Sequence, residues 1–286
     1  MVITAQTQLC GLLGNPVEHS LSPAIHNAAF EKLGLNYAYL AFPVEDENLE
    51  NAIRGIRALG HIRGFSVTIP HKVSIIPLLD SVETTAKHIG SVNTIIKDRG
   101  VLVGSNTDAS GALQALRQGS VDLAGQRVVM LGSGGAARAI AFGLCLEGKI
   151  GDLTLMGIDD KERTALAEDL REKTQTTIAD HSLNSESLEP ALANAHLLIH
   201  CTPIGMHPKI GHSCIPKELL HPGLTVMDIV YNPLNTQLLQ DAQAAGCQTI
   251  QGSEMFLHQA VGQFELWTGQ PAPVDTMRNI LTSHFS

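Results

Sequence analysis

Lys72 is the residue of this sequence best placed to do chemistry. It ends the stretch from Gly64, which reads Gly-Phe-Ser-Val-Thr-Ile-Pro-His-Lys. The apolar run from Ile62 to Ile69 predicts a buried strand, and Pro70 fits the first turn of a following helix. We therefore expect Lys72 near the carboxyl end of a strand, where open α/β sheets bind ligands. Its ammonium group could bind an oxygen, hold a carboxylate or move a proton, and a solvated lysine at a helix start is the alternative.

Two serines lie beside a second predicted helix start, in the stretch from Gly14 to Asn27. Ser22 is a good N-cap residue, with Pro23 at the first helical position. The free N–H groups and positive dipole end of such a terminus attract an anion. Because Ser20 is not needed for the cap, the pair favours a carboxylate site, although Ser22 could serve as a cap alone.

Two further polar residues follow predicted strands. Asn93 lies in Gly90-Ser91-Val92-Asn93-Thr94 and could bond a substrate hydroxyl or stabilise a turn. Asp108 ends the stretch Gly104-Ser105-Asn106-Thr107-Asp108. It could pair with Lys72 or cap a helix that begins near Ala109.

The turn from Gly132 to Ala137 is a dinucleotide-binding fingerprint of the form GxGxxA. Gly132 permits the tight turn, Gly134 lets a pyrophosphate approach the backbone, and Ala137 keeps the helix close to the sheet. The turn follows an apolar strand predicted at 127–131 and opens an alanine-rich helix, which is the context that the fingerprint requires. A plain strand–helix turn is the alternative.

The end of the next predicted strand bears on the type of dinucleotide. Asp159 and Asp160 lie there, followed by Lys161-Glu162-Arg163. A carboxylate accepts hydrogen bonds from a free ribose hydroxyl and repels a phosphate, which favours NAD over NADP. One aspartate could cap the next helix, and Lys161 or Arg163 could turn toward a phosphate.

Composition excludes several classes of protein. Hydrophobic residues make up 44% of the 286 residues and charged ones 16%, which argues against disorder. The net charge of −9 argues against a nucleic-acid partner. We expect no membrane span, signal peptide or metal site, and the unpaired spacing of the five cysteines favours a cytoplasmic protein.

Strands and helices alternate along the chain, which predicts an α/β fold of two domains. The second unit is expected to start after Asp108. We predict strands at 37–42, 62–69, 127–131, 153–158, 196–201, 224–228 and 248–250. Helices are predicted at 48–59, from the glycine turn to about Glu147, at 161–173 and at 254–267.

Taken together, these segments resemble the shikimate dehydrogenase family, in family order and over nearly the whole chain. The substrate-domain pattern is found at 14–27, 64–72, 90–94 and 104–108, and the cofactor-domain pattern at 131–138, 200–206 and 228–233. A C-terminal glutamine segment follows near 252–263. The resemblance implies NAD(P)-dependent oxidation of a ring hydroxyl on shikimate or a relative such as quinate. It also implies a substrate domain at 1–108, a Rossmann domain at 109–252, and C-terminal helices at 253–286 that return to the first domain.

The resemblance assigns roles to individual residues. It implies substrate contacts from Ser20, Ser22, Ser66, Thr68, Asn93, Tyr231 and Gln259. It implies cofactor contacts from Gly132, Gly134, Gly135, Ala136, Thr202, Pro203, Met206 and Gly252, and we expect Asp159 and Asp160 to contact the cofactor as well. The partner is then a small ring carboxylate, and the protein a monomer or homodimer.

The proton relay is assigned to Lys72 and Asp108. Hydride transfer to the cofactor releases a hydroxyl proton, which a base must accept. A free lysine has a pKa of about 10.4, which desolvation lowers and a neighbouring carboxylate raises. We assign Lys72 as the acid/base and Asp108 as its orienting partner, and the reverse remains open.

This sequence departs from the family pattern at three places. The family usually has Asn-Arg-Ser/Thr where this chain has Asp159 and Asp160, and asparagine where it has Ser66. The pair His200-Cys201 replaces the usual start of the 200–206 motif and has no evident meaning in the sequence. Serine lacks the amide's donor, so Ser66 could signal a paralogue specific for quinate or an amino-shikimate, or water could compensate. On that view, Ser66→Asn would improve the use of shikimate by about tenfold. A non-catalytic dinucleotide- or metabolite-binding protein is the alternative from another class.

Overall fold

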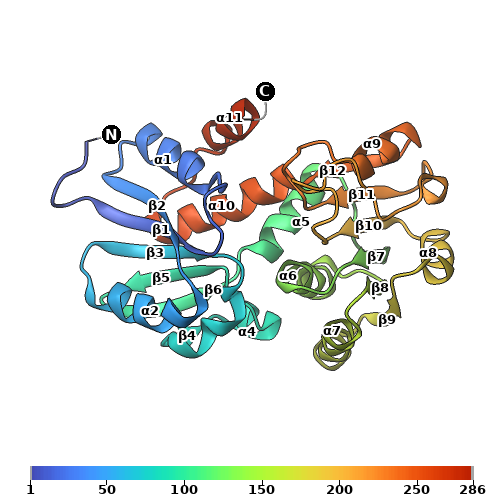
Figure 1. Ribbon diagram of the computed structural model, residues 1–286, viewed down its shortest axis with the longest axis horizontal. Coiled ribbons are helices and arrows are strands. Elements are labelled where there is room, and N and C mark those ends of the chain that lie inside the picture. The colour runs from blue at the N-terminus through green and yellow to red at the C-terminus, as the bar shows by residue number, and fades with distance from the viewer. Residues whose placement is uncertain (1, 285–286) are drawn as a thin grey trace. The chain divides into compact units, whose positions relative to one another are not determined.

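The structure, a computed structural model, describes residues 2–284 and divides into two compact units. The first unit contains the residues up to Thr107 together with those from Gln259 onward. The second unit runs from Asp108 to His258. Each unit is a six-stranded sheet with helices packed against it, so the predicted α/β fold is confirmed (Figure 1).

The sheet of the first unit is mixed. Its strands lie in the order β2-β1-β3-β5-β6-β4. Strands β1, β2 and β3 are parallel, whereas β5 is antiparallel to both β3 and β6. The strands are β1 (Gln8–Gly14), β2 (Tyr37–Pro43), β3 (Ile62–Val67), β4 (Ser81–Val82), β5 (Thr94–Asp98) and β6 (Val101–Ser105).

Helices cover both faces of this sheet, with α1 and α11 on one side and α2 and α4 on the other (Figure 1). Helix α2 is amphipathic and buries Leu49, Ile53 and Ile56 against the sheet. The helices are α1 (Ser22–Lys32), α2 (Leu49–Ala58), α3 (His71–Ser74), α4 (Thr84–Ile89), α11 (Val274–His284) and the part of α10 (Gly252–Thr268) from Gln259 onward.

The second unit has an all-parallel sheet in the order β12-β11-β10-β7-β8-β9. Its strands are β7 (Arg127–Leu131), β8 (Asp152–Gly157), β9 (Thr177–Ser182), β10 (Leu197–His200), β11 (Thr225–Asp228) and β12 (Gln248–Gln251). Its helices are α5 (Asp108–Gln118), α6 (Gly135–Gly143), α7 (Asp160–Lys173), α8 (Ser185–Leu192) and α9 (Gln237–Ala244). This is the doubly wound arrangement expected of a dinucleotide-binding domain.

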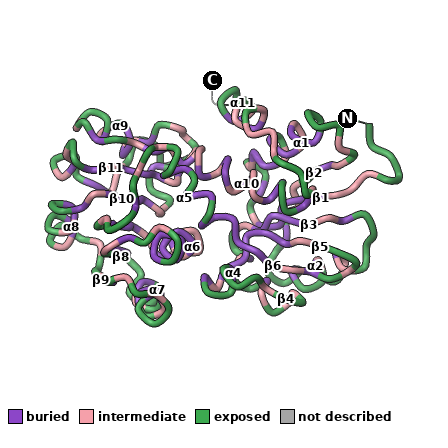
Figure 2. Tube along the Cα trace, turned by 180° about the vertical axis from the view of Figure 1, so that it is seen from behind, coloured by how far each residue is buried: buried purple, intermediate pink, exposed green. Residues whose placement is uncertain are grey.

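The central strands of the second sheet are short apolar runs because helices cover both of their faces. All four residues of β10 and four of the five residues of β7 are buried. Helices α8 and α9 contribute Leu188, Leu192 and Leu239 to the core on one face. Figure 2 shows the same pattern in both units, with buried segments along the strands and exposed ones in the outer helices and loops.

The strand and helix predictions agree with the structure to within a few residues. The strand predicted at 127–131 has those bounds, and the helix predicted at 161–173 begins one residue earlier, at Asp160. Helix α10 starts at Gly252, two residues before the predicted start. The strand predicted at 62–69 ends at Val67, because Thr68 already makes a turn bond to the N–H of His71.

The C-terminal half of α10 packs into the first unit. Trp267 is fully buried, and its indole N–H donates to the carbonyl of Ile95 at 3.0 Å. Gly64 in β3 lies directly beneath it: a Cβ built there would lie 2.1 Å from the Ile95 carbonyl and 2.3 Å from the Trp267 indole nitrogen. Glycine is therefore required at position 64 for Trp267 to occupy its place.

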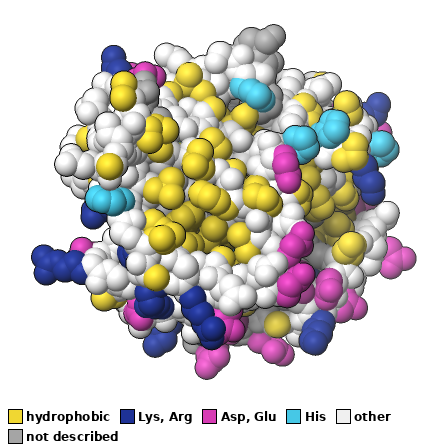
Figure 3. All heavy atoms as spheres, turned by 60° about the vertical axis from the view of Figure 1, so that its left-hand side comes forward, with side chains coloured by type: hydrophobic (Ala, Val, Ile, Leu, Met, Phe, Trp, Pro, Cys, Tyr) yellow, Lys and Arg dark blue, Asp and Glu magenta, His cyan; other side chains and the backbone are white. Residues whose placement is uncertain are grey.

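Apolar side chains are found on the surface as well as in the core. On the face drawn in Figure 3, hydrophobic side chains gather at the centre and charged ones lie mainly around them. Within residues 2–284, no helix combines the length and the apolar character that crossing a bilayer requires.

Gly64→Ala should destabilise the first unit by roughly 3 kcal/mol, because the new methyl group displaces Trp267 from the core. Urea unfolding followed by tryptophan fluorescence measures this directly, since Trp267 is the one tryptophan of the sequence. Gly55→Ala in α2 is the matched control, because a Cβ there meets no atom within 4 Å. It should be neutral or stabilising by up to about 1 kcal/mol. An equal effect of the two substitutions would contradict the packing described for Trp267.

Candidate active site

The carboxyl ends of β1 and β3 place two loops side by side in the first unit. The N–H of Asn15 donates to the carbonyl of Ile69 at 2.9 Å, and that of Thr68 donates to Leu13 at 2.9 Å. Gly14 lies so close to Thr68 that a Cβ there would approach its methyl group to 2.2 Å. The stretches 14–27 and 64–72, which are far apart in sequence, thus meet at one edge of the sheet.

The start of α1 differs from the sequence prediction. Leu21, not Ser22, is the N-cap residue, and Ser22 is the first helical residue. The Oγ of Ser20 accepts the N–H of Ser22 at 3.2 Å. The prediction of Ser22 as the cap is therefore wrong, because Ser20 supplies a hydroxyl to this helix terminus. Ser22 is buried, and Ser20 is half-buried.

Lys72 lies in the short helix α3 and is half-buried. Its carbonyl accepts the N–H of Val92 at 2.8 Å, which brings the turn of Asn93 next to it. The Asn93 amide donates to the Oγ1 of Thr107 at 3.0 Å, and its Oδ1 accepts the N–H of Thr107 at 2.8 Å. Lys72, Asn93 and Thr107 are therefore held in one part of the first unit.

Asp108 directly follows Thr107 and is the first residue of α5. It is only 5% exposed. Asn93 holds the backbone of Thr107, the last residue before α5 in the sequence. A buried carboxylate at a helix start is stabilised by the positive end of the helix dipole.

Ser66 belongs to a buried chain of side-chain hydrogen bonds. Its Oγ accepts the Tyr39 hydroxyl at 2.7 Å and donates to the Oε1 of Gln263 at 2.8 Å. The Gln263 amide donates in turn to the carbonyl of Asn93 and to Thr94. The Ser66 proton is thus used inside the protein, in a network that connects β3 to β2 and α10. Burial raises the pKa of the Tyr39 hydroxyl, which keeps it a donor.

Gln263 and Tyr39 were not identified from the sequence. Gln263 is 1% exposed and lies one helical turn after Gln259, which is half-buried on α10. The available signal was a polar residue one helical turn after the predicted glutamine. Its three partners, Ser66, Asn93 and Thr94, lie far away in the sequence.

The glycine turn of the second unit has the geometry that its fingerprint requires. Gly132 adopts a φ of +104°, which L side chains rarely adopt, and a Cβ there would lie 2.8 Å from the carbonyl of Cys201. Gly134 is the N-cap of α6, which begins at Gly135. The N–H groups at the start of α6, from Gly135 and Ala136, lie where the pyrophosphate of a dinucleotide is bound in this fold.

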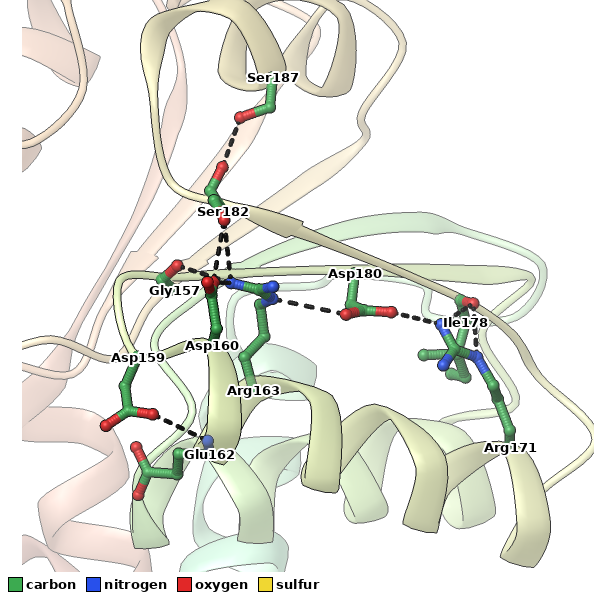
Figure 4. Close-up of polar contacts among 10 residues, drawn as sticks. All are labelled: Gly157, Asp159, Asp160, Glu162, Arg163, Arg171, Ile178, Asp180, Ser182 and Ser187. Carbon is green, nitrogen blue, oxygen red and sulfur yellow. Dashed lines mark hydrogen bonds and ion pairs between the residues drawn. The ribbon is translucent and has the colours of Figure 1, made fainter.

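Carboxylates surround the end of β8, as Figure 4 shows. Asp159 is the N-cap of α7 and accepts the N–H of Glu162 at 2.9 Å. Asp160 instead accepts hydrogen bonds from Arg163 and from Ser182, which hold its pKa below the usual range. The two aspartates therefore have different roles, and Asp159 is turned away from Arg163.

Arg163 is enclosed rather than free. It is 7% exposed and contacts Asp160, Asp180 and the carbonyl of Gly157 (Figure 4). Burial alone would lower its pKa, but the bonds and charges of Asp160 and Asp180 raise the pKa overall. The guanidinium thus forms its hydrogen bonds and ion pairs with neighbours in its own unit.

Glu162 is a third acidic residue at this place, and its role was not predicted from the sequence. Its side chain accepts a hydrogen bond from the Oγ of Ser133, in the glycine turn, at 3.0 Å. The exposed carboxylate thereby links α7 to the loop where a dinucleotide pyrophosphate is expected.

The remaining predicted residues lie at the carboxyl ends of β10, β11 and β12. Thr202 is half-buried, and Pro203 and Met206 are exposed. Tyr231 stacks on Phe256 with ring centroids 4.7 Å apart, and burial raises the pKa of its hydroxyl. Gly252 is required because a Cβ there would lie 2.5 Å from the backbone of Ile229. These side chains share one edge of the sheet with the glycine turn.

Among residues 2–284, no group of three or more His, Cys, Asp or Glu side chains is arranged to hold a metal ion. Each of the five cysteines is a free thiol.

Comparisons with known proteins identify relatives of the whole chain. Residues 12–95 match the model of the shikimate dehydrogenase substrate binding domain, and residues 252–282 match that of the shikimate 5′-dehydrogenase C-terminal domain. The NADP(+) shikimate dehydrogenase of Methanopyrus kandleri is 45% identical over 99% of this chain and 97% of its own length.

Two solved structures are also closely similar. A shikimate dehydrogenase in complex with NADP+ superposes with a TM-score of 0.94 at 39% identity, covering 100% of this chain and 98% of that one. The shikimate 5-dehydrogenase of Listeria monocytogenes, in complex with shikimate and NAD, superposes with a TM-score of 0.92 at 38% identity and 98% coverage of both chains.

Proposed function

Since this chain belongs to the shikimate dehydrogenase family, we propose that it is an oxidoreductase that interconverts shikimate and 3-dehydroshikimate with a nicotinamide dinucleotide. The single observation that carries the proposal is the convergence of Lys72, Asn93 and Thr107 in the first unit. Pure dinucleotide binding does not need a lysine held beside a turn of polar side chains. The direct test is dinucleotide reduction with shikimate, followed by absorbance.

We propose that the substrate is held by Ser20, Ser22, Ser66, Thr68, Asn93, Tyr231 and Gln259. The helix start near Ser20 and the turn of Asn93 supply hydroxyl, amide and N–H groups, which suit a carboxylate and neighbouring ring hydroxyls. The cofactor is assigned to the glycine turn, to the acidic end of β8, and to Thr202, Pro203, Met206 and Gly252. Tyr231 and Gln259 are included from the family pattern.

The proton relay is proposed for Lys72 and Asp108. The dinucleotide, when bound, accepts hydride from the ring carbon, so the protein must receive the hydroxyl proton. Lys72 is the acid/base of the proposal, and Asp108 orients it. The turn of Val92 and Asn93 supports the proposal for Lys72, since it bonds to the Lys72 carbonyl and to the N–H of Thr107, the residue before Asp108 in the sequence.

The preference for NAD is also a proposal. Asp159 and Glu162 are exposed carboxylates on the same turn of α7, and they would repel a 2′-phosphate. Arg163 is already engaged by Asp160 and Asp180, so it is a poor phosphate ligand. The comparisons include relatives that use NADP+ as well as one that was crystallised with NAD.

We place the reaction in the cytoplasm and expect a monomer or a homodimer. The five free thiols support a cytoplasmic location, because disulfides form and persist in oxidising compartments. Sedimentation of the purified protein distinguishes the two oligomeric states.

Lys72→Ala should lower kcat with shikimate by about 10²-fold or more, which is the usual contribution of a general acid–base group. Dinucleotide affinity should stay within about twofold, because binding and proton transfer use different groups. Lys87→Ala, at an exposed position of α4, is the matched control and should keep parental turnover. If the Lys72 variant turns over at the parental rate, Lys72 is not the acid/base.

Asp159→Asn should raise kcat/KM for NADP by about tenfold, or about 1.4 kcal/mol, and change the value for NAD less. Asparagine caps a helix as well as aspartate does, so the change removes charge without removing the cap. Glu168→Gln, exposed further along α7, is the control for a general loss of negative charge. The proposal fails if the parent clearly prefers NADP at saturating shikimate.

Ser66→Asn should lower kcat/KM for shikimate, in contrast to the tenfold gain expected from the family pattern. The larger side chain must displace Tyr39 or Gln263, whose bonds to Ser66 are buried, and overpacking of this kind typically costs about 1–3 kcal/mol. Steady-state kinetics with shikimate and quinate, together with a thermal melt, measure the effect. A tenfold gain in kcat/KM for shikimate with an unchanged melting temperature would contradict this prediction and support the one made from the family pattern.

A further inference from the structure

His200 lies at the carboxyl end of β10 and is buried, with 1% of its surface exposed. Its Nδ1 lies 2.9 Å from the Oδ1 of Asp228, at the end of the neighbouring strand β11. Its Nε2 contacts the Oγ1 of Thr202, one of the residues proposed above to contact the cofactor. The imidazole thus bridges a buried carboxylate and a residue of the site.

Asp228 is fixed from several sides. It is fully buried, its Oδ1 accepts the N–H of Val230 at 3.0 Å, and its Oδ2 accepts the Thr236 hydroxyl at 2.6 Å. Thr236 is the N-cap of α9. Apart from His200, the printed partners of both carboxyl oxygens are donors, so Asp228 presents a buried acceptor to the imidazole.

The ring of His200 is therefore protonated at neutral pH. Burial alone would lower its pKa, but the bond and charge of Asp228, with a smaller contribution from Cys214, raise the pKa to about 9. Asp228, Thr202 and Cys214 are the groups that act on the ring, and burial keeps the neighbouring Cys201 a neutral thiol by raising its pKa. Both ring N–H groups then donate, one to Asp228 and one to Thr202.

This protonation state sets the direction of the Thr202 hydroxyl. Its oxygen accepts from His200 and from the N–H of Ile204 at 3.3 Å, so its own proton is available to another group. Thr202 also adjoins the dinucleotide fingerprint: a Cβ at Gly132 would lie 3.3 Å from its methyl group. Once His200 loses a proton, Nε2 becomes an acceptor and takes the Thr202 proton for itself.

We infer that His200 is a positioning residue that makes Thr202 a hydrogen-bond donor toward the nicotinamide end of the bound dinucleotide. The inference rests on the proposed function, because it requires the dinucleotide to bind at this edge of the second sheet. It gives a role to His200, where the family pattern has asparagine. An asparagine amide can also donate to Thr202, but it does not titrate.

The test is the affinity for NADH, measured by its fluorescence between about pH 7 and pH 10.5. The parent should lose about fivefold in affinity as the pH rises through about 9, the contribution of one net hydrogen bond. His200→Asn should bind with an affinity that does not vary over the same range. Thr202→Val should bind more weakly and show the same flat profile. His88→Asn, at an exposed position of α4, is the matched control and should follow the parent.

A second measurement needs no ligand. The imidazole signal of His200, identified in NMR spectra by its absence from His200→Asn, should titrate near 9. Because this pKa is raised on folding, the stabilisation from the pair is present below about pH 6.5 and is lost as the pH rises through about 9. A merely structural histidine would change the melting temperature but not the pH profile of NADH binding.

The outcomes are separable. If the parent binds NADH and His200→Asn shows the same pH dependence, this inference is overturned and the proposed function stands. If the parent binds no dinucleotide at any pH, the proposed function fails and this inference fails with it. If His200→Asn does not fold, Thr202→Val carries the test, since a pH dependence retained in that variant overturns the inference.

Discussion

The side chain of Gln263 is buried, so each of its polar atoms needs a hydrogen-bond partner. This constraint determines how the first unit is assembled. This side chain is 1% exposed, and its amide bonds to Ser66, Thr94 and the backbone of Asn93. Leaving one such group without a partner costs about 1–3 kcal/mol, so the helix that carries Gln263 can adopt only one register against β3 and β5. The same bonds hold the turn of Asn93, and that turn contacts the backbone of Lys72 and Thr107. A residue outside the predicted site therefore supports the side chains that would do the chemistry.

The sequence was a good guide where the determinants are local. Apolar runs bounded by glycine or proline predicted the strands, and the turn from Gly132 to Ala137 predicted its own strand and helix, because each signal lies within a few residues. It failed at the start of α1, where the choice between Ser20 and Ser22 depends on backbone geometry that a list of cap residues does not contain. It also could not find Tyr39 or Gln263, whose partners are up to 197 residues away.

The acidic end of β8 shows why a residue's charge alone is a weak guide to specificity. Three acidic and two basic residues lie within five positions of the sequence. Their order alone does not show whether this place attracts or repels a phosphate. In the structure Arg163 is enclosed by Asp160 and Asp180, whereas Asp159 and Glu162 remain exposed (Figure 4). Desolvation of a guanidinium is costly unless carboxylates compensate it, so the pairing that stabilises Arg163 also withdraws it from a ligand. Asp160 thus determines the charge at this end of β8 through its bond to Arg163.

The same need to pair buried polar groups explains how the fold accommodates the buried His200–Asp228 pair. A buried ion pair is tolerated only if the remaining polar atoms of both groups are satisfied, and here Val230, Thr236 and Thr202 provide the bonds. Each of these residues lies at the carboxyl edge of the second sheet, beyond the strands that form its core. Substitutions within β10 would disturb packing against β7 and β11, whereas a change at its last residue alters only the groups at that edge. The end of the strand is therefore where this chain can differ from its relatives in proton chemistry while keeping their fold.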